Sequence, residues 1–132
     1  MDCKDKNFQG NGGLMGLSTH VLDTMHGCPA AGMAVTLWET RVNGEASLLQ
    51  SFTLNEDGRN PAGLLIAHDA LRIGTYRLTF DVAGYFSAKG VVLPTPNFLN
   101  HVALDFGVAK PDEHYHVPLL VSPWSYSTYR GS

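Results

Sequence analysis

The sequence of 132 residues lacks several features that would assign it to a specialised class of protein. No uninterrupted apolar stretch approaches the ~18 residues that a membrane-spanning helix requires, so we expect no membrane partner. Positive charge is scarce, because 9 Lys and Arg against 12 Asp and Glu give a formal net charge of −3. Nucleic-acid-binding proteins present concentrated positive charge to the phosphates, and we therefore expect no nucleic-acid partner either.

Cysteine is also scarce, with Cys3 near the start of the sequence and Cys28 beside Pro29. Two cysteines are too few for the disulfide framework of a small secreted protein. We therefore interpret both as free thiols in a reducing compartment. The first residues contain no apolar secretory signal, which favours a cytoplasmic protein. A peroxisomal or periplasmic location is the alternative if a targeting segment is missing.

The composition is that of a single folded domain. Hydrophobic residues make up 44% of the sequence and charged residues 16%, as in ordinary soluble globular proteins. A chain of this length can bury a core without disulfides or metals to hold it together. Glycine and polar residues dominate the segment before residue 17, which predicts a flexible lead-in over residues 1–16. Residues 17–132 are predicted to form the domain.

Apolar side chains alternate with polar ones at a period of two, which indicates strands rather than helices. The segments with this alternation are 33–38, 48–54, 75–82, 101–108 and 115–121, and residues 17–23 are interpreted as the first strand. Turn sequences such as Asn43-Gly44 separate them, a pattern typical of an antiparallel sandwich or barrel. Only residues 83–90 are compatible with a short helix. We predict an all-β fold.

Two histidines, His114 and His116, stand two residues apart in the last predicted strand, so their side chains share one face. The apolar residues of that strand occupy the other face, so the imidazoles should point away from the interior, towards solvent or a partner subunit. Pro118 cannot donate a hydrogen bond to a ladder, which predicts an edge strand or a bulge. In the first predicted strand, His20 shares a face with Ser18.

The pattern alone leaves three interpretations open. The His-x-His pair could be a polar stripe on an exposed strand. It could hold zinc together with a third histidine, although no cysteine or carboxylate has compelling ligand spacing nearby. It could also serve metal-free hydrolysis, with a histidine as general base and Arg59, after the tight Asp57-Gly58 turn, as an anion clamp. A serine nucleophile is not favoured, because no Gly-x-Ser-x-Gly elbow is present. We interpret the remaining histidines as ordinary surface or loop residues: His26, His68 and His101.

Several motifs, taken together and in this order, resemble those of the transthyretin-like 5-hydroxyisourate hydrolases. They are Leu17-Ser-Thr-His-Val-Leu-Asp23, Gly27-x-Pro-Ala-x-Gly32, Asp57-Gly-Arg59, His114-Tyr-His-Val-Pro-Leu-Leu120 and Ser125-Tyr-Ser-Thr-Tyr-Arg-Gly-Ser132. The terminal Tyr-Arg-Gly-Ser combined with His-Tyr-His is highly specific, whereas each shorter match alone would be weak. The resemblance runs from about Leu17 to the last residue.

This resemblance implies a prealbumin-like sandwich of two four-stranded antiparallel sheets with one short helix. It further implies a homotetramer, a dimer of dimers with its sites at the subunit interface. The implied reaction is a step of urate breakdown, the hydrolysis of 5-hydroxyisourate to 2-oxo-4-hydroxy-4-carboxy-5-ureidoimidazoline, with no cofactor and no metal. The alternative is a transthyretin-like protein that binds a small ligand such as thyroid hormone, although such carriers do not keep the terminal motif and the catalytic histidines together.

The resemblance also implies roles for individual residues. The catalytic set would be His20, Arg59, His116 and Ser132. Of these, His20, Arg59 and Ser132 would also contact the substrate, beside Tyr129, Arg130 and Gly131.

Overall fold

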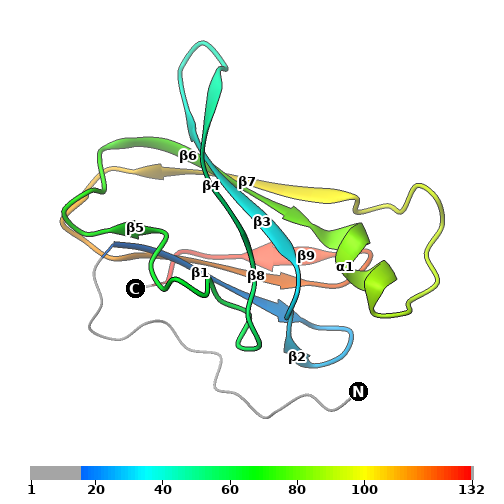
Figure 1. The fold of residues 1–132 in the computed structure, drawn as a ribbon. Coiled ribbons are helices and arrows are strands. Elements are labelled where there is room, and N and C mark those ends of the chain that lie inside the picture. Colours follow the sequence, from blue (N-terminus) through cyan, green and yellow to red (C-terminus); the bar gives the residue numbers. More distant parts are fainter. Residues whose placement is uncertain (1–15, 132) are drawn as a thin grey trace.

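The computed structural model describes residues 16–131. Two β-sheets pack face to face, with a short helix at one end (Figure 1). The first sheet contains β1 (Gly16–Asp23), β2 (Cys28–Pro29), β5 (Ile66–Ala67), β8 (Tyr115–Val121) and β9 (Tyr126–Thr128). The second contains β3 (Ala34–Thr40), β4 (Ala46–Thr53), β6 (Gly74–Asp81) and β7 (His101–Val108). The predicted all-β sandwich is therefore confirmed.

The second sheet is four-stranded and antiparallel in the order β4-β3-β6-β7, as expected. The first sheet has five strands, because β2 and β5, of two residues each, both pair with β1. Its two long strands, β1 and β8, run parallel, with Ser18 opposite His116 and His20 opposite Pro118. Alternation of side chains has the same period in parallel and antiparallel pairs, so the sequence could not reveal this direction.

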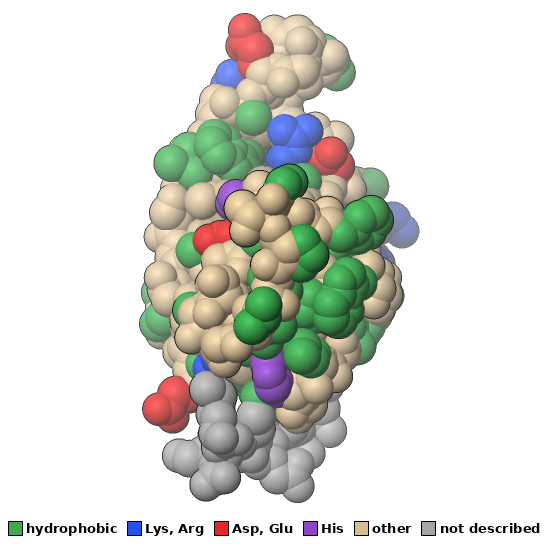
Figure 2. Space-filling view, turned by 90° about the vertical axis from the view of Figure 1, so that its right-hand side faces the viewer, with side chains coloured by type: hydrophobic (Ala, Val, Ile, Leu, Met, Phe, Trp, Pro, Cys, Tyr) green, Lys and Arg blue, Asp and Glu red, His purple; other side chains and the backbone are tan. Residues whose placement is uncertain are grey.

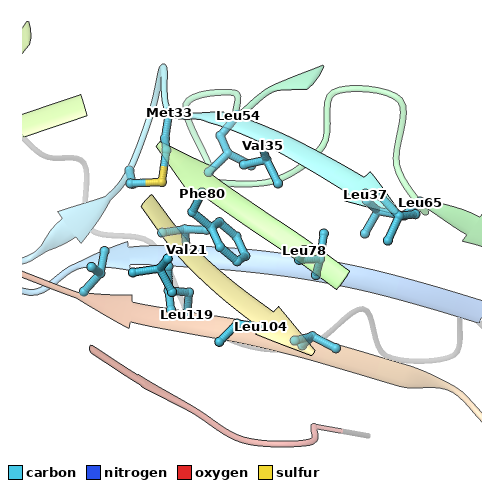
Figure 3. Packing of buried hydrophobic residues seen from close by; sticks show 14 of the residues in the cluster. Val21, Met33, Val35, Leu37, Leu54, Leu65, Leu78, Phe80, Leu104 and Leu119 are labelled. Atoms are coloured by element: carbon cyan, nitrogen blue, oxygen red, sulfur yellow. The ribbon is translucent and has the colours of Figure 1, made fainter. Parts of the chain in front are cut away.

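The hydrophobic core lies between the two sheets (Figure 3). Val21 and Leu119 from the first sheet meet Leu78 and Phe80 from the second, and all four are fully buried. Each such side chain stabilises the fold by about 1.5–3 kcal/mol relative to an exposed one. Because β1 and β8 direct these apolar residues inward, the intervening residues of both strands lie on the outer face of the first sheet. That face carries the histidines.

A single helix within the described residues, α1 (Val82–Ala88), follows β6 directly and begins close to the predicted position. The Asp81 carboxylate caps it by accepting a hydrogen bond of 3.1 Å from the backbone N–H of Gly84. The buried Tyr85 of this helix donates its hydroxyl hydrogen bond to Asp23 at the end of β1, at 2.7 Å. The helix is thereby attached to the first sheet. No helix within residues 16–131 is long and apolar enough to span a bilayer.

The expectation that Pro118 marks an edge strand or a bulge is wrong, since β8 lies between β1 and β9 in regular register. Pro118 instead interrupts the β8–β9 ladder. Leu119 pairs with Thr128, and His116 forms an isolated bridge with Gly131, but no pair is formed at the proline between them. Proline has no N–H to donate, so the ladder stops there and resumes at the bridge.

The expectation of a free thiol at Cys28 is also wrong, because this residue is disulfide-bonded. The number of cysteines argues against a framework of several disulfides, but it cannot exclude a single one. Cys3, most of the predicted lead-in and Ser132 lie outside the described residues.

Candidate active site

Two imidazoles lie side by side on the outer face of the β1–β8 pair. The ring centroids of His20 and His116 are 6.3 Å apart. The direction predicted for the histidines is correct, since they point away from the core. They are nevertheless buried, with exposed fractions of only 1% for His20 and 2% for His116. An exposed polar stripe therefore does not describe this face, because further segments of the chain cover it.

One covering segment is the loop that carries Arg59. Asn55 closes the turn by accepting a hydrogen bond from the N–H of Gly58 and donating one to the carbonyl of Arg59, both at 2.9 Å. The carbonyl of Gly58 accepts a hydrogen bond of 2.9 Å from Val21, the residue after His20. A side chain at position 58, where φ is +72°, would place its Cβ only 2.5 Å from the Val21 carbonyl oxygen. Glycine is required here, and the close approach anchors Arg59 beside β1.

The second covering segment is the end of the described chain. Gly131 donates a hydrogen bond of 2.7 Å to the carbonyl of His116 and accepts one of 3.3 Å from its N–H. A Cβ added to Gly131 would lie 3.0 Å from Cδ2 of the His116 ring. The chain end thus folds back against the imidazole. Ser132, the next residue, lies outside the described residues, and its catalytic role stays a prediction.

Tyr129 and Arg130, also predicted to line the substrate site, both line a pocket beside Tyr115 and Val117 of β8. Tyr129 is 56% exposed. The Arg130 guanidinium lies over the Tyr115 ring, 4.2 Å from its centroid, and donates hydrogen bonds of 2.9 Å to Glu113 and 3.2 Å to the carbonyl of His114. The structure places Gly131 directly against His116, and the substrate-binding roles of Tyr129 and Arg130 stay predictions.

The electrostatics of the site keep both imidazoles neutral. Burial, and secondarily the positive charge of Arg59, lowers the pKa of His20 and of His116 from 6.5 to about 4. A hydrogen bond with the backbone of Asp57 acts in the opposite direction on His20. Burial also lowers the pKa of Arg59, and the Asp57 charge opposes this shift. Near neutral pH the site therefore presents two proton-accepting imidazoles within the field of one guanidinium.

Ser18, which was assigned no role from the sequence, belongs to the same cluster. Its Oγ lies 2.7 Å from Nδ1 of His116 and 3.2 Å from Nε2 of His114. The two histidine rings are 6.3 Å apart and nearly parallel, as their shared face predicts. The signal for Ser18 was present in the sequence, because a residue two positions before His20 in a strand must share its face.

The other histidines lie outside this cluster. His68 and His101 are exposed, as expected. His26 is more than a surface residue, because its Nδ1 lies 2.6 Å from the fully buried Asp23 carboxylate and its ring stacks on Phe86. Within residues 16–131, no three His, Cys, Asp or Glu side chains are grouped as metal ligands.

Comparison with known proteins places this arrangement in a family. A model of the HIUase/Transthyretin family matches residues 17–131. The chain belongs to this family. It is 52% identical over 117 residues to a 5-hydroxyisourate hydrolase of Pseudomonas aeruginosa, covering 88% of this chain and 90% of that protein. It is 53% identical over 116 residues to a 5-hydroxyisourate hydrolase of Ralstonia nicotianae, covering 88% and 97%.

Solved structures of the family share the fold. An (S)-allantoin synthase superposes with a TM-score of 0.83 at 44% identity over 90% of this chain, which spans only 44% of the synthase. The 5-hydroxyisourate hydrolase of Klebsiella pneumoniae gives a TM-score of 0.73 at 32% identity, covering 90% of this chain and all of that one. Sea bream transthyretin in complex with thyroxine gives 0.74 at 26% identity, covering 87% and 93%. An enzyme and a hormone-binding protein thus superpose equally well, and only the site can separate them.

Proposed function

We propose that this protein hydrolyses 5-hydroxyisourate to 2-oxo-4-hydroxy-4-carboxy-5-ureidoimidazoline. The observation that carries the proposal is the buried pair of neutral imidazoles, His20 and His116, beside the charge of Arg59. Relatives that bear the name 5-hydroxyisourate hydrolase match 88% of the chain at about 50% identity. Desolvated titratable groups with shifted pKa values are characteristic of catalytic sites and have no evident use in a carrier.

The chemistry is the hydrolysis of a ring amide. One neutral imidazole takes a proton from water while the water oxygen attacks the ring carbonyl carbon. Negative charge then gathers on the former carbonyl oxygen, where the fixed cation of Arg59 stabilises it more strongly than solvent would. The carbon–nitrogen bond breaks, and the leaving nitrogen takes up the proton held by the imidazolium just formed. The water oxygen remains in the new carboxylate, and the released nitrogen becomes part of the ureido group.

A direct assay tests this function. Urate oxidase generates 5-hydroxyisourate in the cuvette, and its ultraviolet absorbance is followed with and without the protein. We expect a large acceleration of the decay by the wild-type protein and little by His116→Gln. The alternative, a transthyretin-like carrier, would instead give thyroxine binding in a competition assay and no acceleration.

The proposed mechanism uses no metal and no cofactor. Two imidazoles and a guanidinium provide the base, the acid and the charge stabilisation that amide hydrolysis requires. We therefore expect the rate to survive prolonged treatment with a chelator followed by dialysis. A stoichiometric zinc whose removal abolishes turnover and whose return restores it would contradict the metal-free mechanism.

We also propose a homotetramer, a dimer of dimers with its sites at the subunit interface. In support, β9 is the outer strand of the first sheet, and aromatic side chains on it and next to it are exposed, including Trp124, Tyr126 and Tyr129. Figure 2, which views the molecule from the end that carries α1, shows hydrophobic side chains gathered along one side of that face. Light scattering coupled to size-exclusion chromatography should give four times the monomer mass, and a monomer would contradict this assembly.

A further inference from the structure

Ser18 joins the two histidines of the His-x-His motif. It is 1% exposed, and the parallel register of β1 and β8 places it directly opposite His116. Its Oγ lies within hydrogen-bond distance of both His116 Nδ1, at 2.7 Å, and His114 Nε2, at 3.2 Å. The acid–base chemistry described above makes no use of this hydroxyl.

A serine hydroxyl carries one proton, so it can donate to only one of the two imidazoles and accepts from the other. If Ser18 donates to His116, the neutral His116 ring keeps its own proton on Nε2. If Ser18 donates to His114, then His116 donates from Nδ1 to Ser18 and has its lone pair on Nε2. The direction of this short chain therefore decides which nitrogen of His116 can accept a proton.

The surroundings of His116 favour the second arrangement. Its Nε2 is buried without a hydrogen-bond partner within the described residues, so it is the nitrogen left for water or substrate. The ring is also held from both edges, because Ser18 contacts Nδ1 and Gly131 lies against Cδ2. A base in this position requires a lone pair on Nε2, and a proton there would block it.

The geometry at His114 is compatible with the same direction. Its Nε2 lies 3.2 Å from Ser18 Oγ, and its Nδ1 is buried without a hydrogen-bond partner within the described residues. A neutral His114 with its proton on Nδ1 presents the lone pair of Nε2 to the serine hydroxyl.

We propose that Ser18 is a positioning residue that holds His116 with its proton on Nδ1 and its lone pair on Nε2, which makes His116 the general base. The inference rests on the proposed hydrolysis and deepens it by assigning the base. The proton from water enters Nε2, and the imidazolium formed donates from Nδ1 to Ser18, whose own proton remains directed at His114. No proton needs to leave Ser18 during turnover.

Kinetics of Ser18 variants test this role. Ser18→Ala removes the hydroxyl with little change in volume, and we expect kcat to fall about 10-fold or more while KM stays nearly constant. Ser18→Thr keeps a hydroxyl and should retain most of kcat. The matched control is Thr19→Val, because the buried hydroxyl of Thr19 also joins β1 to β8, donating to the Val117 carbonyl at 2.7 Å, but on the inward face. That variant should lose stability and keep wild-type kcat per folded protein.

The tautomer itself can be observed without substrate. Long-range proton–nitrogen spectra of nitrogen-15-labelled protein identify which ring nitrogen carries the proton, with His116→Gln and His114→Gln variants for assignment. We expect Nδ1–H for His116 in the wild type and in Ser18→Thr, and a shift to Nε2–H in Ser18→Ala. A wild-type His116 protonated on Nε2, or a Ser18→Ala variant with unchanged kcat, would overturn the proposal. A wild-type protein that fails to hydrolyse 5-hydroxyisourate would overturn the proposed function instead, while leaving the spectra interpretable.

Discussion

Strand β1 carries two buried polar networks, one in its first half and one at its end, and they differ in how completely they are paired. At the end, both oxygens of the Asp23 carboxylate are engaged: one accepts from the backbone N–H of His26 at 3.0 Å, and the other from Tyr85 at 2.7 Å, with His26 Nδ1 at 2.6 Å. In the first half, Ser18 engages only one nitrogen of His116, and Nε2 has no partner within the described residues.

The titration behaviour of the two networks differs in the same sense. Burial and the hydrogen bond to Asp23 raise the pKa of Tyr85, so its hydroxyl remains a fixed donor. Burial and the charge of Arg59 lower the pKa of His116 to about 4, so its ring remains neutral and Nε2 remains available as an acceptor. A buried polar group is therefore not itself a sign of function. Incomplete pairing combined with a shifted pKa is the sign that distinguishes the proposed catalytic network from the structural one.

Substitutions in the incompletely paired network should have the largest effect on activity. His20→Ala, Arg59→Ala and His116→Ala should each lower kcat/KM by roughly 10²-fold or more, because each removes the base, the acid or the charge stabilisation. The ultraviolet decay of 5-hydroxyisourate measures the loss. The exposed His68 provides the control, and His68→Ala should keep the wild-type rate.

Folding must be checked in these variants, because both site histidines are buried and not exposed as the sequence suggested. An alanine in their place leaves a cavity, so some loss of stability is expected alongside the loss of rate. Circular dichroism at the assay temperature gives the folded fraction. A loss of activity in His68→Ala equal to that in the site variants would refute the assignment.

A smaller loss of activity is expected from Gly131→Ala. The added methyl group would lie 3.0 Å from the His116 ring, closer than ordinary contact, so the ring or the chain end must shift. We expect kcat to fall about 10-fold, which corresponds to ~1.4 kcal/mol of transition-state stabilisation. Gly107→Ala is the matched control for the loss of a glycine, since its backbone is not in the left-handed region and an added Cβ would meet only the Gly74 carbonyl oxygen, at 4.0 Å. Wild-type kcat in Gly131→Ala would show that the chain end does not position His116.

Much of the fold could be predicted from the sequence, because side chains that alternate at a period of two must sort onto two faces. The predicted segments coincide with all the long strands of the described residues, and residues 83–90, set apart as a possible short helix, overlap α1. The pattern did not locate β2, β5 and β9, since two or three residues are too few to show a period. It also could not give the parallel direction of β1 and β8, which places Ser18 rather than His20 opposite His116.

The site could be predicted in part. The resemblance implies roles for His20, Arg59 and His116. The structure places the two imidazole rings 6.3 Å apart, and the charge of Arg59 is close enough to lower the pKa of both. Their burial could not be anticipated, because it depends on long-range backbone contacts made by Gly58 and Gly131.

The fully paired network should affect stability and leave catalysis unchanged. Asp23→Ala leaves the buried Tyr85 hydroxyl without its acceptor, so we expect the free energy of unfolding to fall by about 2–3 kcal/mol. His26→Ala should cost less, near ~1 kcal/mol, because its side chain is 35% exposed and water can replace it. Urea titration measures both losses. A 10-fold loss of kcat in well-folded Asp23→Ala would show that the two networks of β1 are coupled and not independent.

The smallest expected effect is that of a moderate change in pH on the rate. Because the pKa of His20 and of His116 is lowered to about 4, kcat/KM should stay constant from neutral pH to about pH 5 and fall by half near pH 4, as acid protonates the base. An ordinary exposed histidine would give the fall near pH ~6.5. Arg59→Gln removes one cause of the shift, so the residual activity of that variant should fall at a higher pH than in the wild type.

Acid should also destabilise the fold, and the two effects must be separated. The unfolded chain binds protons on its histidines below pH ~6.5, whereas folded His20 and His116 do so only near pH 4. Between these values the unfolded state holds more protons, so stability is complete above pH ~6.5 and declines as the pH falls towards 4. Circular dichroism at each pH identifies the range in which the protein is still folded, and only rates from that range count. A fall of the rate centred near pH 6.5 in folded wild-type protein would mean that the base is a solvated group. The buried network around His116 would then not supply the base.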